Sequence, residues 1–598
     1  MQEIGYKRIM ILGNLIKLLN NRIFFLIFYA LLLVFALVPY YTDGTVILGG
    51  EGDFALDFSS HLSKHGFMWV SLYGVGLPNM APTGTGLNIL FLSLIEKLTR
   101  NIAITNFALI FSIYFFPFFA MYLVCKKIKS TPFTSFVISF FYVVNPFMLY
   151  YLINLNQWNV FSVSVMPMFL WIILKYYYSN FKLFFFFGIL SAAFSFAYSN
   201  VPLLAIIQIS IVFSVFMVSY YYNKRLILSQ IFKKYTIVFV SFISFNLWWI
   251  LSLLEVIMPA TQKIYSPSFA QSWLETTVSG HRPIIAKMFL LKGLIGNNPS
   301  YDFFTYLYNT IFAHFITLVP ILLIIYFVLI SRDKKTKNLL NITIFSVLLI
   351  VLFLLKGNAN PFGFIYNLMF KHLPFFYMFK SPTEKFGLLY IFIFTVLLML
   401  ILNGLNQQYY KPIMTVFIIY LIFCSIPALT GNIIPDYNIG AYGYVSRKYK
   451  DKMEYKQVRE VINNDKYPYR VLSLPGSQNY QVAMSNYNNK KYTGLDPVLM
   501  NTNKPFIALQ HHIDLLYDHI SSRNYRKLLG LYNIGEIMIN EDLVPWFGVR
   551  ESESVPELKK IFDEYMTSKR WGRITLYYNN QDYFLPRIYA APLSAPIK

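Results

Sequence analysis

Charged side chains are scarce in this sequence. They account for 13% of the 598 residues, whereas a soluble protein of this length carries roughly 25%. Hydrophobic residues reach 56%, and the mean hydropathy is +0.49. This composition excludes an ordinary soluble protein for most of the chain and indicates an integral membrane protein.

Cysteine is almost absent, and acidic residues are few. Cys125 and Cys424 both lie at or inside apolar segments, so a disulfide framework and a cysteine metal site are excluded, and we expect two buried thiols. The 28 acidic residues face 51 basic ones, which gives a net charge of +23. Lysine and arginine collect in the cytoplasmic loops of membrane proteins, so this charge does not indicate nucleic acid as a partner.

Nucleotide-binding motifs are missing as well. The sequence has no Gly-Lys-Ser/Thr phosphate loop, no dinucleotide fingerprint and no nucleophile elbow. We therefore expect no nucleotide cofactor and no direct use of cytoplasmic ATP.

Apolar runs long enough to cross hydrocarbon recur along the chain. They predict eleven membrane-spanning helices, at 23–41, 103–124, 131–152, 160–178, 183–198, 201–221, 236–256, 304–330, 339–355, 386–403 and 412–432. No A-x-A cleavage site follows the first of them, so we expect a retained helix rather than a signal peptide.

The lysines and arginines of the short loops predict the orientation. With the N-terminus in the cytoplasm, the basic clusters at 126–129, 175–182, 224–234 and 332–337 all fall on the cytoplasmic side. The prediction is therefore a multi-pass protein of the plasma membrane.

Four longer pieces then lie outside the membrane, namely the loops 42–102, 257–303 and 356–385 and the tail 433–598. The tail has the charge content of a soluble protein. It mixes strand-like runs (469–474, 535–539) with helical ones (454–462, 505–516). We predict a transmembrane domain at 1–432, which includes the large first outer loop, and an extracytoplasmic α/β or α+β domain at 433–598.

The first outer loop contains the acidic stretch 49–57. Asp53 and Asp57 lie four residues apart, so a helix would place both carboxylates on one face. Glycines 49, 50 and 52 allow close backbone approach. A partly desolvated carboxylate here would have a pKa suited to accepting a proton; the alternative is a solvated loop or a helix cap.

A second candidate is the basic stretch that enters the tenth predicted span. Pro382 is typical of a helix start, and helix N-termini attract phosphate. Lys380 and Lys385 would add ammonium donors to a lipid phosphate. The alternative is a pair of interfacial lysines that extend outward to water.

Further candidates lie in other outer loops. Arg282 is a candidate clamp for phosphate and His281 a candidate proton donor, although both are also ordinary loop residues. Trp158 and Asn200 occupy short outer turns and are candidates for contacting sugar hydroxyls. The pair His511-His512 lacks a third ligand at zinc spacing, so we expect no zinc there.

Several of these stretches resemble the GT-C superfamily of membrane glycosyltransferases, and in particular the arabinofuranosyltransferase-like and YfhO-like membrane proteins of bacteria and archaea. The similar stretches are Gly52-Asp53, Trp69, Gly74-Val75-Gly76, Pro78-Asn79, Asn145-Pro146-Phe147, 379–386, Tyr469-Arg470-Val471-Leu472, Leu474-Pro475-Gly476, Gly494-Leu495-Asp496-Pro497 and 528–534. A second acidic residue in a later outer loop, common in the superfamily, has no clear match.

The resemblance implies transfer of a sugar from a polyprenyl-phosphate donor to a glycan, lipid or protein acceptor outside the cytoplasm. By it the catalytic carboxylate is Asp53, with Asp57 as the alternative or partner. Glu51, Asp53 and Asp57 are also candidate ligands of a divalent cation, Mg or Mn. A transporter or flippase of lipid-linked glycans and a non-catalytic cell-surface assembly protein stay open as alternatives.

Overall fold

The structure is a computed structural model of the 598-residue chain. It describes residues 21–41, 45–49, 56, 58, 69–70, 77–78, 80–145, 147–148, 157–198, 201–223, 227–264, 270–272, 274–275, 311–330, 339–429, 446–465, 467, 469–477, 481–487, 490–496, 498, 502, 504, 506–509, 525–544 and 555–579. These residues belong to two compact units. One comprises Met1–Thr42 and Phe107–Pro435, and the other Asp43–Asn106 and Asp436–Lys598.

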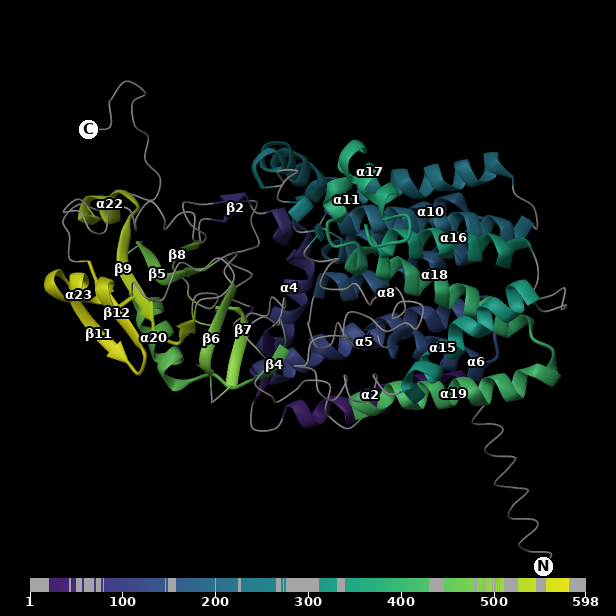
Figure 1. The fold of residues 1–598 in the computed structure, drawn as a ribbon, viewed down its shortest axis with the longest axis horizontal. Helices are drawn as coiled ribbons and strands as arrows, with labels where there is room; N and C mark the ends of the chain where they lie inside the picture. The colour runs from purple at the N-terminus through teal and green to yellow at the C-terminus, as the bar shows by residue number, and fades with distance from the viewer. Residues whose placement is uncertain are drawn as a thin grey trace, which may run out of the picture. The chain divides into compact units, whose positions relative to one another are not determined.

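The first unit is a bundle of apolar helices (Figure 1). Its helices are α2 (Arg22–Leu37), α5 (Ile102–Lys127), which begins in the second unit, α6 (Pro132–Val143), α8 (Gln157–Tyr176), α9 (Asn180–Ala193), α10 (Val201–Asn223), α11 (Leu228–Ile264), α15 (Ile311–Ile325), α16 (Leu339–Leu355), α17 (Gly363–His372), α18 (Pro382–Gly404) and α19 (Gln407–Leu429). Short turns of helix add η1 (Val38–Tyr40), η3 (Ser195–Ala197), η4 (Tyr326–Ile330) and η5 (Phe376–Phe379).

Helix α18 is the most buried of the long helices that the structure describes, with 89% of its most apolar window inside the protein. It packs against α6, α8, α10, α15 and α16. Phe141 on α6 lies 5.8 Å from Phe394, and Phe213 on α10 lies 5.9 Å from Phe392, measured between ring centroids. The core of this unit is therefore built largely from aromatic rings around α18, which uses much of the high phenylalanine content.

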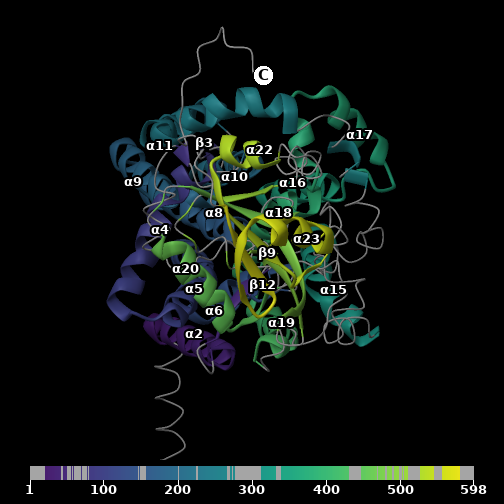
Figure 2. The ribbon, with the colours of Figure 1, turned by 90° about the vertical axis from the view of Figure 1, so that its left-hand side faces the viewer.

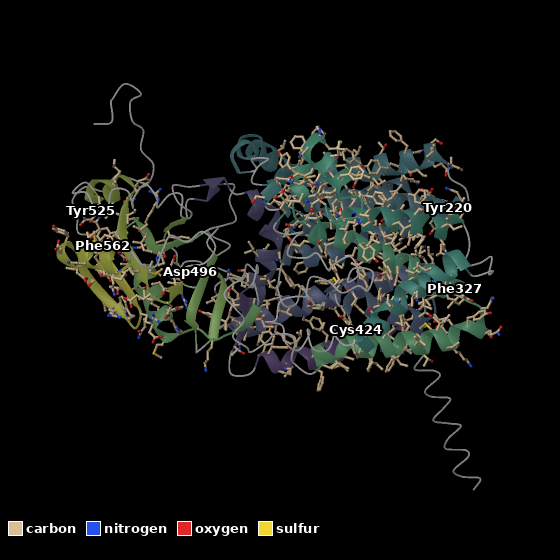
Figure 3. The ribbon with its side chains drawn as sticks, viewed as in Figure 1. Tyr220, Phe327, Cys424, Asp496, Tyr525 and Phe562 are labelled. Carbon is tan, nitrogen blue, oxygen red and sulfur yellow. The ribbon has the colours of Figure 1, made fainter. Side chains whose placement is uncertain are left out.

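Each predicted span contains an apolar helix. Among the described residues, six helices are long and apolar enough to cross a membrane: Arg22–Tyr40, Ile102–Lys127, Val201–Asn223, Leu228–Leu251, Pro382–Gly404 and Gln407–Ile426. The helices in the other five predicted spans are shorter, so the number of eleven crossings stays a prediction. Cys125 and Cys424 are buried free thiols, as expected. Figure 3 labels Cys424 in the helical bundle.

The second unit joins part of the first loop to the tail. Strand β1 (Val46–Gly49) pairs antiparallel with β4 (Ser446–Tyr449), with Ile47 opposite Lys448. The loop also contributes the short pair β2 (Trp69–Val70) and β3 (Leu77–Pro78), followed by α4 (Met80–Thr99). A strand before the second span and a strand after the last one therefore form one small sheet.

The tail has a mixed sheet of five strands in the order β11-β12-β9-β5-β8, which we name the tail sheet. Its strands are β5 (Arg470–Ser477), β8 (Phe506–Leu509), β9 (Ile534–Asn540), β11 (Thr567–Trp571) and β12 (Ile574–Tyr578). Strand β5 is parallel to both neighbours, whereas β12 is antiparallel to β9 and β11. A second sheet contains β6 (Gln481–Tyr487), β7 (Lys490–Leu495) and β10 (Leu543–Val544).

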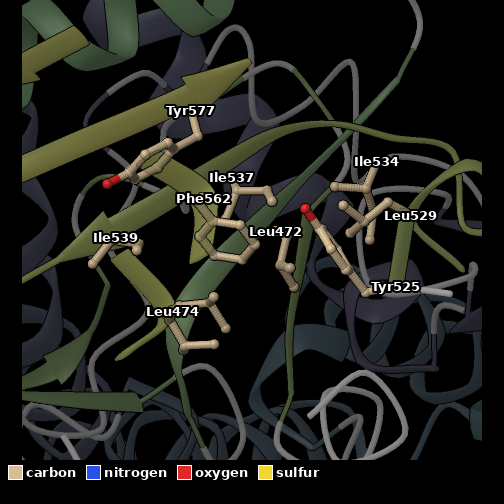
Figure 4. Packing of buried hydrophobic residues seen from close by; sticks show 10 residues of the cluster. Leu472, Leu474, Tyr525, Leu529, Ile534, Ile537, Ile539, Phe562 and Tyr577 are labelled. Carbon is tan, nitrogen blue, oxygen red and sulfur yellow. The ribbon is translucent and has the colours of Figure 1, made fainter. Parts of the chain in front are cut away.

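Helices α20 (Met453–Asn464), α22 (Tyr525–Leu531) and α23 (Val555–Tyr565) accompany these strands. The core of the tail gathers Leu472 and Ile537 from the sheet with Tyr525 and Phe562 from α22 and α23 (Figure 4). Strands and helices of the tail therefore share one core.

One expected element of the tail is wrong. We expected a helix over 505–516, but Phe506–Leu509 is strand β8, and residues 510–516 lie outside the described part of the chain. Val471 and Leu472 of β5 pair with Phe506 and Ile507. A short apolar run fits either a helix or a buried strand, and pairing with β5 decides for the strand.

Candidate functional site

The structure describes three of the predicted site residues in whole or in part. Lys380 and Lys385 flank the start of α18, and Trp158 lies in the first turn of α8, where only its backbone is described. The other predicted site residues lie outside the described residues: Glu51, Asp53, Asp57, Asn200, His281 and Arg282. His511 and His512 also lie outside them.

The start of α18 is held by two neighbouring helices. Pro382 is its first residue, as predicted, and Ser381 does not cap the helix through its side chain. The Thr383 hydroxyl donates to the carbonyl of Leu355 on α16 at 3.4 Å. The Tyr366 hydroxyl on α17 donates to the carbonyl of Phe379 at 2.8 Å. The turn that carries Lys380 is therefore fixed from both sides.

The charge of Lys385 acts on Lys380. Both side chains are half-buried. Burial lowers the pKa of the Lys380 ammonium, and the positive charge of Lys385 lowers it further. A phosphate bound at this turn would oppose both effects, because its negative charge favours the charged form of the Lys380 ammonium.

Phe147, in the Asn-Pro-Phe stretch after α6, packs against the first turns of α18. The amide of Asn145 donates to the carbonyls of Phe141 and Tyr142, and its oxygen accepts from the N–H of Met148 at 3.1 Å. The ring of Phe147 lies against Gly387 so closely that a Cβ there would be 2.4 Å from the ring carbons. Asn145 therefore ends α6 in a way that places Phe147 against the start of α18.

The beginning of α8 belongs to the same end of the bundle. The Tyr142 hydroxyl of α6 donates to the carbonyl of Val163 at 2.7 Å. The Ser162 hydroxyl donates to the carbonyl of Ala197, which lies three residues before Asn200. Hydrogen bonds therefore join α8 both to α6 and to the short helical turn η3, which are far apart in sequence.

The second unit fixes the chain on both sides of the acidic stretch. The Asn106 carboxamide accepts from the N–H of Ile47 at 2.9 Å and donates to its carbonyl at 3.1 Å. Beyond the acidic residues, the N–H of Phe58 donates to the Glu96 carboxylate at 2.8 Å. The segment between β1 and Phe58 is therefore held at both ends within this unit.

Sequence reasoning missed Tyr366 and Asn106, which position the two candidate stretches. Each is a hydrogen-bonding side chain within an apolar segment, and that is the signal that could have singled them out. Within the described part of the chain, no three His, Cys, Asp or Glu side chains gather closely enough to hold a metal ion. The three carboxylates that we expected to bind a cation lie outside that part.

These features define a class of protein. The long apolar helices make it a membrane protein, and its fold is GT-C-like, as comparison with solved structures shows. The sequence matches no protein-family model and no curated protein.

Solved structures that share this fold include those of the arabinofuranosyltransferase AftD from Mycobacteria. One has 12% sequence identity to this chain and a TM-score of 0.57. Its alignment covers 94% of this chain and 40% of the AftD chain. A structure of the R1389S mutant has 13% identity and a TM-score of 0.56, and covers 94% and 42% of the two chains. The present chain therefore spans about two fifths of the AftD structures it matches.

Proposed function

We propose that this protein is a glycosyltransferase that moves a sugar from a polyprenyl-phosphate donor to a glycan, lipid or protein acceptor outside the cytoplasm. The observation that carries the proposal is the fold shared with an arabinofuranosyltransferase over 94% of this chain. The basic clusters of the short loops support a plasma-membrane protein with a cytoplasmic N-terminus and an extracytoplasmic tail.

In this proposal Asp53 is the general base, with Asp57 as the alternative or partner. The carboxylate takes the proton of the acceptor hydroxyl, whose oxygen forms a new bond to the anomeric carbon of the sugar. The bond from that carbon to the phosphate oxygen breaks, and the polyprenyl phosphate leaves with the electron pair. Lys380 and Lys385 stabilise its charge at the start of α18.

The remaining predicted residues take supporting roles. Arg282 and His281 contact the donor phosphate, and Trp158 and Asn200 contact the sugar. Glu51, Asp53 and Asp57 provide three carboxylates within one short stretch, which is the donor chemistry that Mg or Mn takes in proteins. No nucleotide cofactor is needed, because the donor lipid supplies the leaving group.

The base is tested with purified protein, a polyprenyl-phosphate sugar and a mixture of acceptors. Asp53→Asn should retain expression and folding but lose transfer by a factor of about 100 or more, since a general base contributes roughly 10²–10⁴-fold. Asp57→Asn is the matched variant that separates the two carboxylates. Normal transfer by both variants would contradict the assignment, and lipid movement without transfer by the unmodified protein would favour a flippase.

The lysine pair is tested through the pH dependence of donor binding. Only protonated Lys380 binds phosphate, and its pKa is lowered by burial and by Lys385. The KM for the donor should therefore rise at alkaline pH as Lys380 loses its proton, whereas Lys380→Arg should keep a flat profile because arginine stays charged.

Lys380→Gln should raise the donor KM at every pH by about 10-fold or more, since a hydrogen bond to a charged group contributes about 1.5–3 kcal/mol. Lys371→Gln, at an exposed lysine of α17, is the control and should leave KM unchanged. A Lys380→Gln variant with the KM of the unmodified protein would exclude phosphate binding at this turn.

A further inference from the structure

Helix α17 lies at the rim of the helical bundle (Figure 2). In the chain it follows α16 and precedes α18. It runs from Gly363 to His372, and ten residues of α-helix extend only about 15 Å. Because the hydrocarbon core of a bilayer is about 30 Å thick, α17 does not cross it. The helix instead connects the end of one apolar helix with the start of the next.

The inner face of α17 is occupied by the protein. Gly363, Tyr366 and Phe370 are buried on it. The Tyr366 ring lies 5.2 Å from that of Phe376, and its hydroxyl donates to Phe379. This face therefore holds α17 to the turn that leads into α18.

The outer face of α17 is apolar and uncovered. Phe364 is 64% exposed and Leu368 is 55% exposed, and the two lie four residues apart on one side of the helix. Ile365, beside Phe364, is exposed as well. A helix in contact with water would place polar residues at these positions.

Two further exposed phenylalanines flank α17 in the chain. Phe362 and Phe375 adopt left-handed backbone conformations, with φ of 62° and 63°, and their side chains are 62% and 60% exposed. This conformation is costly for a bulky residue. In water, burial of the two exposed rings would not offset this cost.

The surroundings indicate what covers these rings. Leu349 and Ile350 on the neighbouring helix α16 are also exposed, and α16 contains no charged residue. The last turn of α17 carries Lys371 and His372. An apolar face with a basic end, beside a helix suited to hydrocarbon, is typical of a helix in the membrane interface.

We propose that α17 lies in the interface of the lipid bilayer, with Phe364 and Leu368 among the acyl chains. Lys371 then lies at the level of the lipid phosphates. Through Tyr366, the helix sets the position of the start of α18 relative to the membrane surface. This inference does not depend on the glycosyltransferase reaction.

The depth of α17 is measured by electron paramagnetic resonance on the full chain in nanodiscs of phosphatidylethanolamine and phosphatidylglycerol. Nitroxide labels are attached to Phe364→Cys and Leu368→Cys, both at exposed positions. The unmodified protein is the labelling blank, since Cys125 and Cys424 are buried. We expect collisions with oxygen to exceed those with a water-soluble nickel chelate several-fold at both sites.

Two matched labels calibrate the result. Ile350→Cys on α16 should report a deeper position than Phe364→Cys, and Lys371→Cys a shallower one. Frequent collisions of the nickel chelate at 364 and 368 would place the face in water and overturn the proposal. Low collision rates with both reagents would mean that a protein surface covers α17, which would overturn it as well.

Discussion

At the scale of single residues, Glu536 is a buried carboxyl of the tail sheet with a shifted pKa. It is fully buried on β9, with its Oε2 3.8 Å from the Lys504 ammonium. Lys504 is also 2.9 Å from the Asp465 carboxylate, and it lies over the ring of Tyr469. Burial raises the pKa of Glu536 to about 7; Lys504 opposes this shift and Asp465 adds to it.

This carboxyl makes the stability of the tail depend on pH. The folded tail holds the proton of Glu536 up to about pH 7, whereas the unfolded chain releases it near the usual value of 4.5. The contribution of Glu536 to stability is therefore fully present below about pH 4.5 and is lost as the pH rises to about 7. The total loss is on the order of 3 kcal/mol, since one pKa unit corresponds to about 1.4 kcal/mol.

Glu536→Gln should flatten this dependence because the amide does not ionise, while Lys504 keeps its pair with Asp465. Pulse proteolysis in urea at several pH values measures the effect on the tail. Glu460→Gln is the control, since Glu460 is exposed on α20 and pairs with Lys456 only at 4.0 Å. An unchanged pH profile in Glu536→Gln would show that another group causes the dependence.

At the scale of elements, the contact between Phe147 and Gly387 joins the Asn-Pro-Phe stretch after α6 to the start of α18. Asn145 ends α6 through its side-chain hydrogen bonds, and Phe147 then packs against Gly387. Gly387 lies two residues after Lys385. The position of the lysine turn therefore depends on a small residue at 387 as well as on its own hydrogen bonds.

Gly387→Ala should displace the ring of Phe147 and destabilise the bundle by about 1–3 kcal/mol, as overpacked cores do. It should also raise the donor KM, which Phe147→Leu in the same chain should partly restore. Gly188→Ala on α9 is a matched control, because its Cβ would lie 2.3 Å from the ring of Phe245 in α11. Equal effects of Gly387→Ala and Gly188→Ala on the donor KM would exclude a specific role for the contact between Phe147 and Gly387.

At the scale of the whole molecule, segments distant in sequence share the same folding unit. Strand β1 precedes most of the apolar helices, and β4 follows the last of them, yet the two pair residue by residue. The Asn106 side chain holds the same strand through both of its polar atoms. The first loop thus belongs to the unit that contains the tail.

The sequence by itself determined where the apolar helices lie, that α18 begins at Pro382 and that two thiols are buried. These properties depend on local hydrophobicity, chain length and proline geometry, which neighbouring residues specify. It also indicated the GT-C-like fold through short motifs. Asp53, Asp57, Arg282 and His281 stay predictions, since they lie outside the described residues.

Only the tertiary structure decided which distant segments meet. It made Phe506–Leu509 a strand by pairing it with β5, and it placed Phe147 on Gly387 and β1 beside β4. An apolar run or a lone asparagine specifies that a partner is needed without specifying which one. The partner follows from packing and hydrogen bonding across the whole chain, because buried polar groups find most of their partners in distant segments.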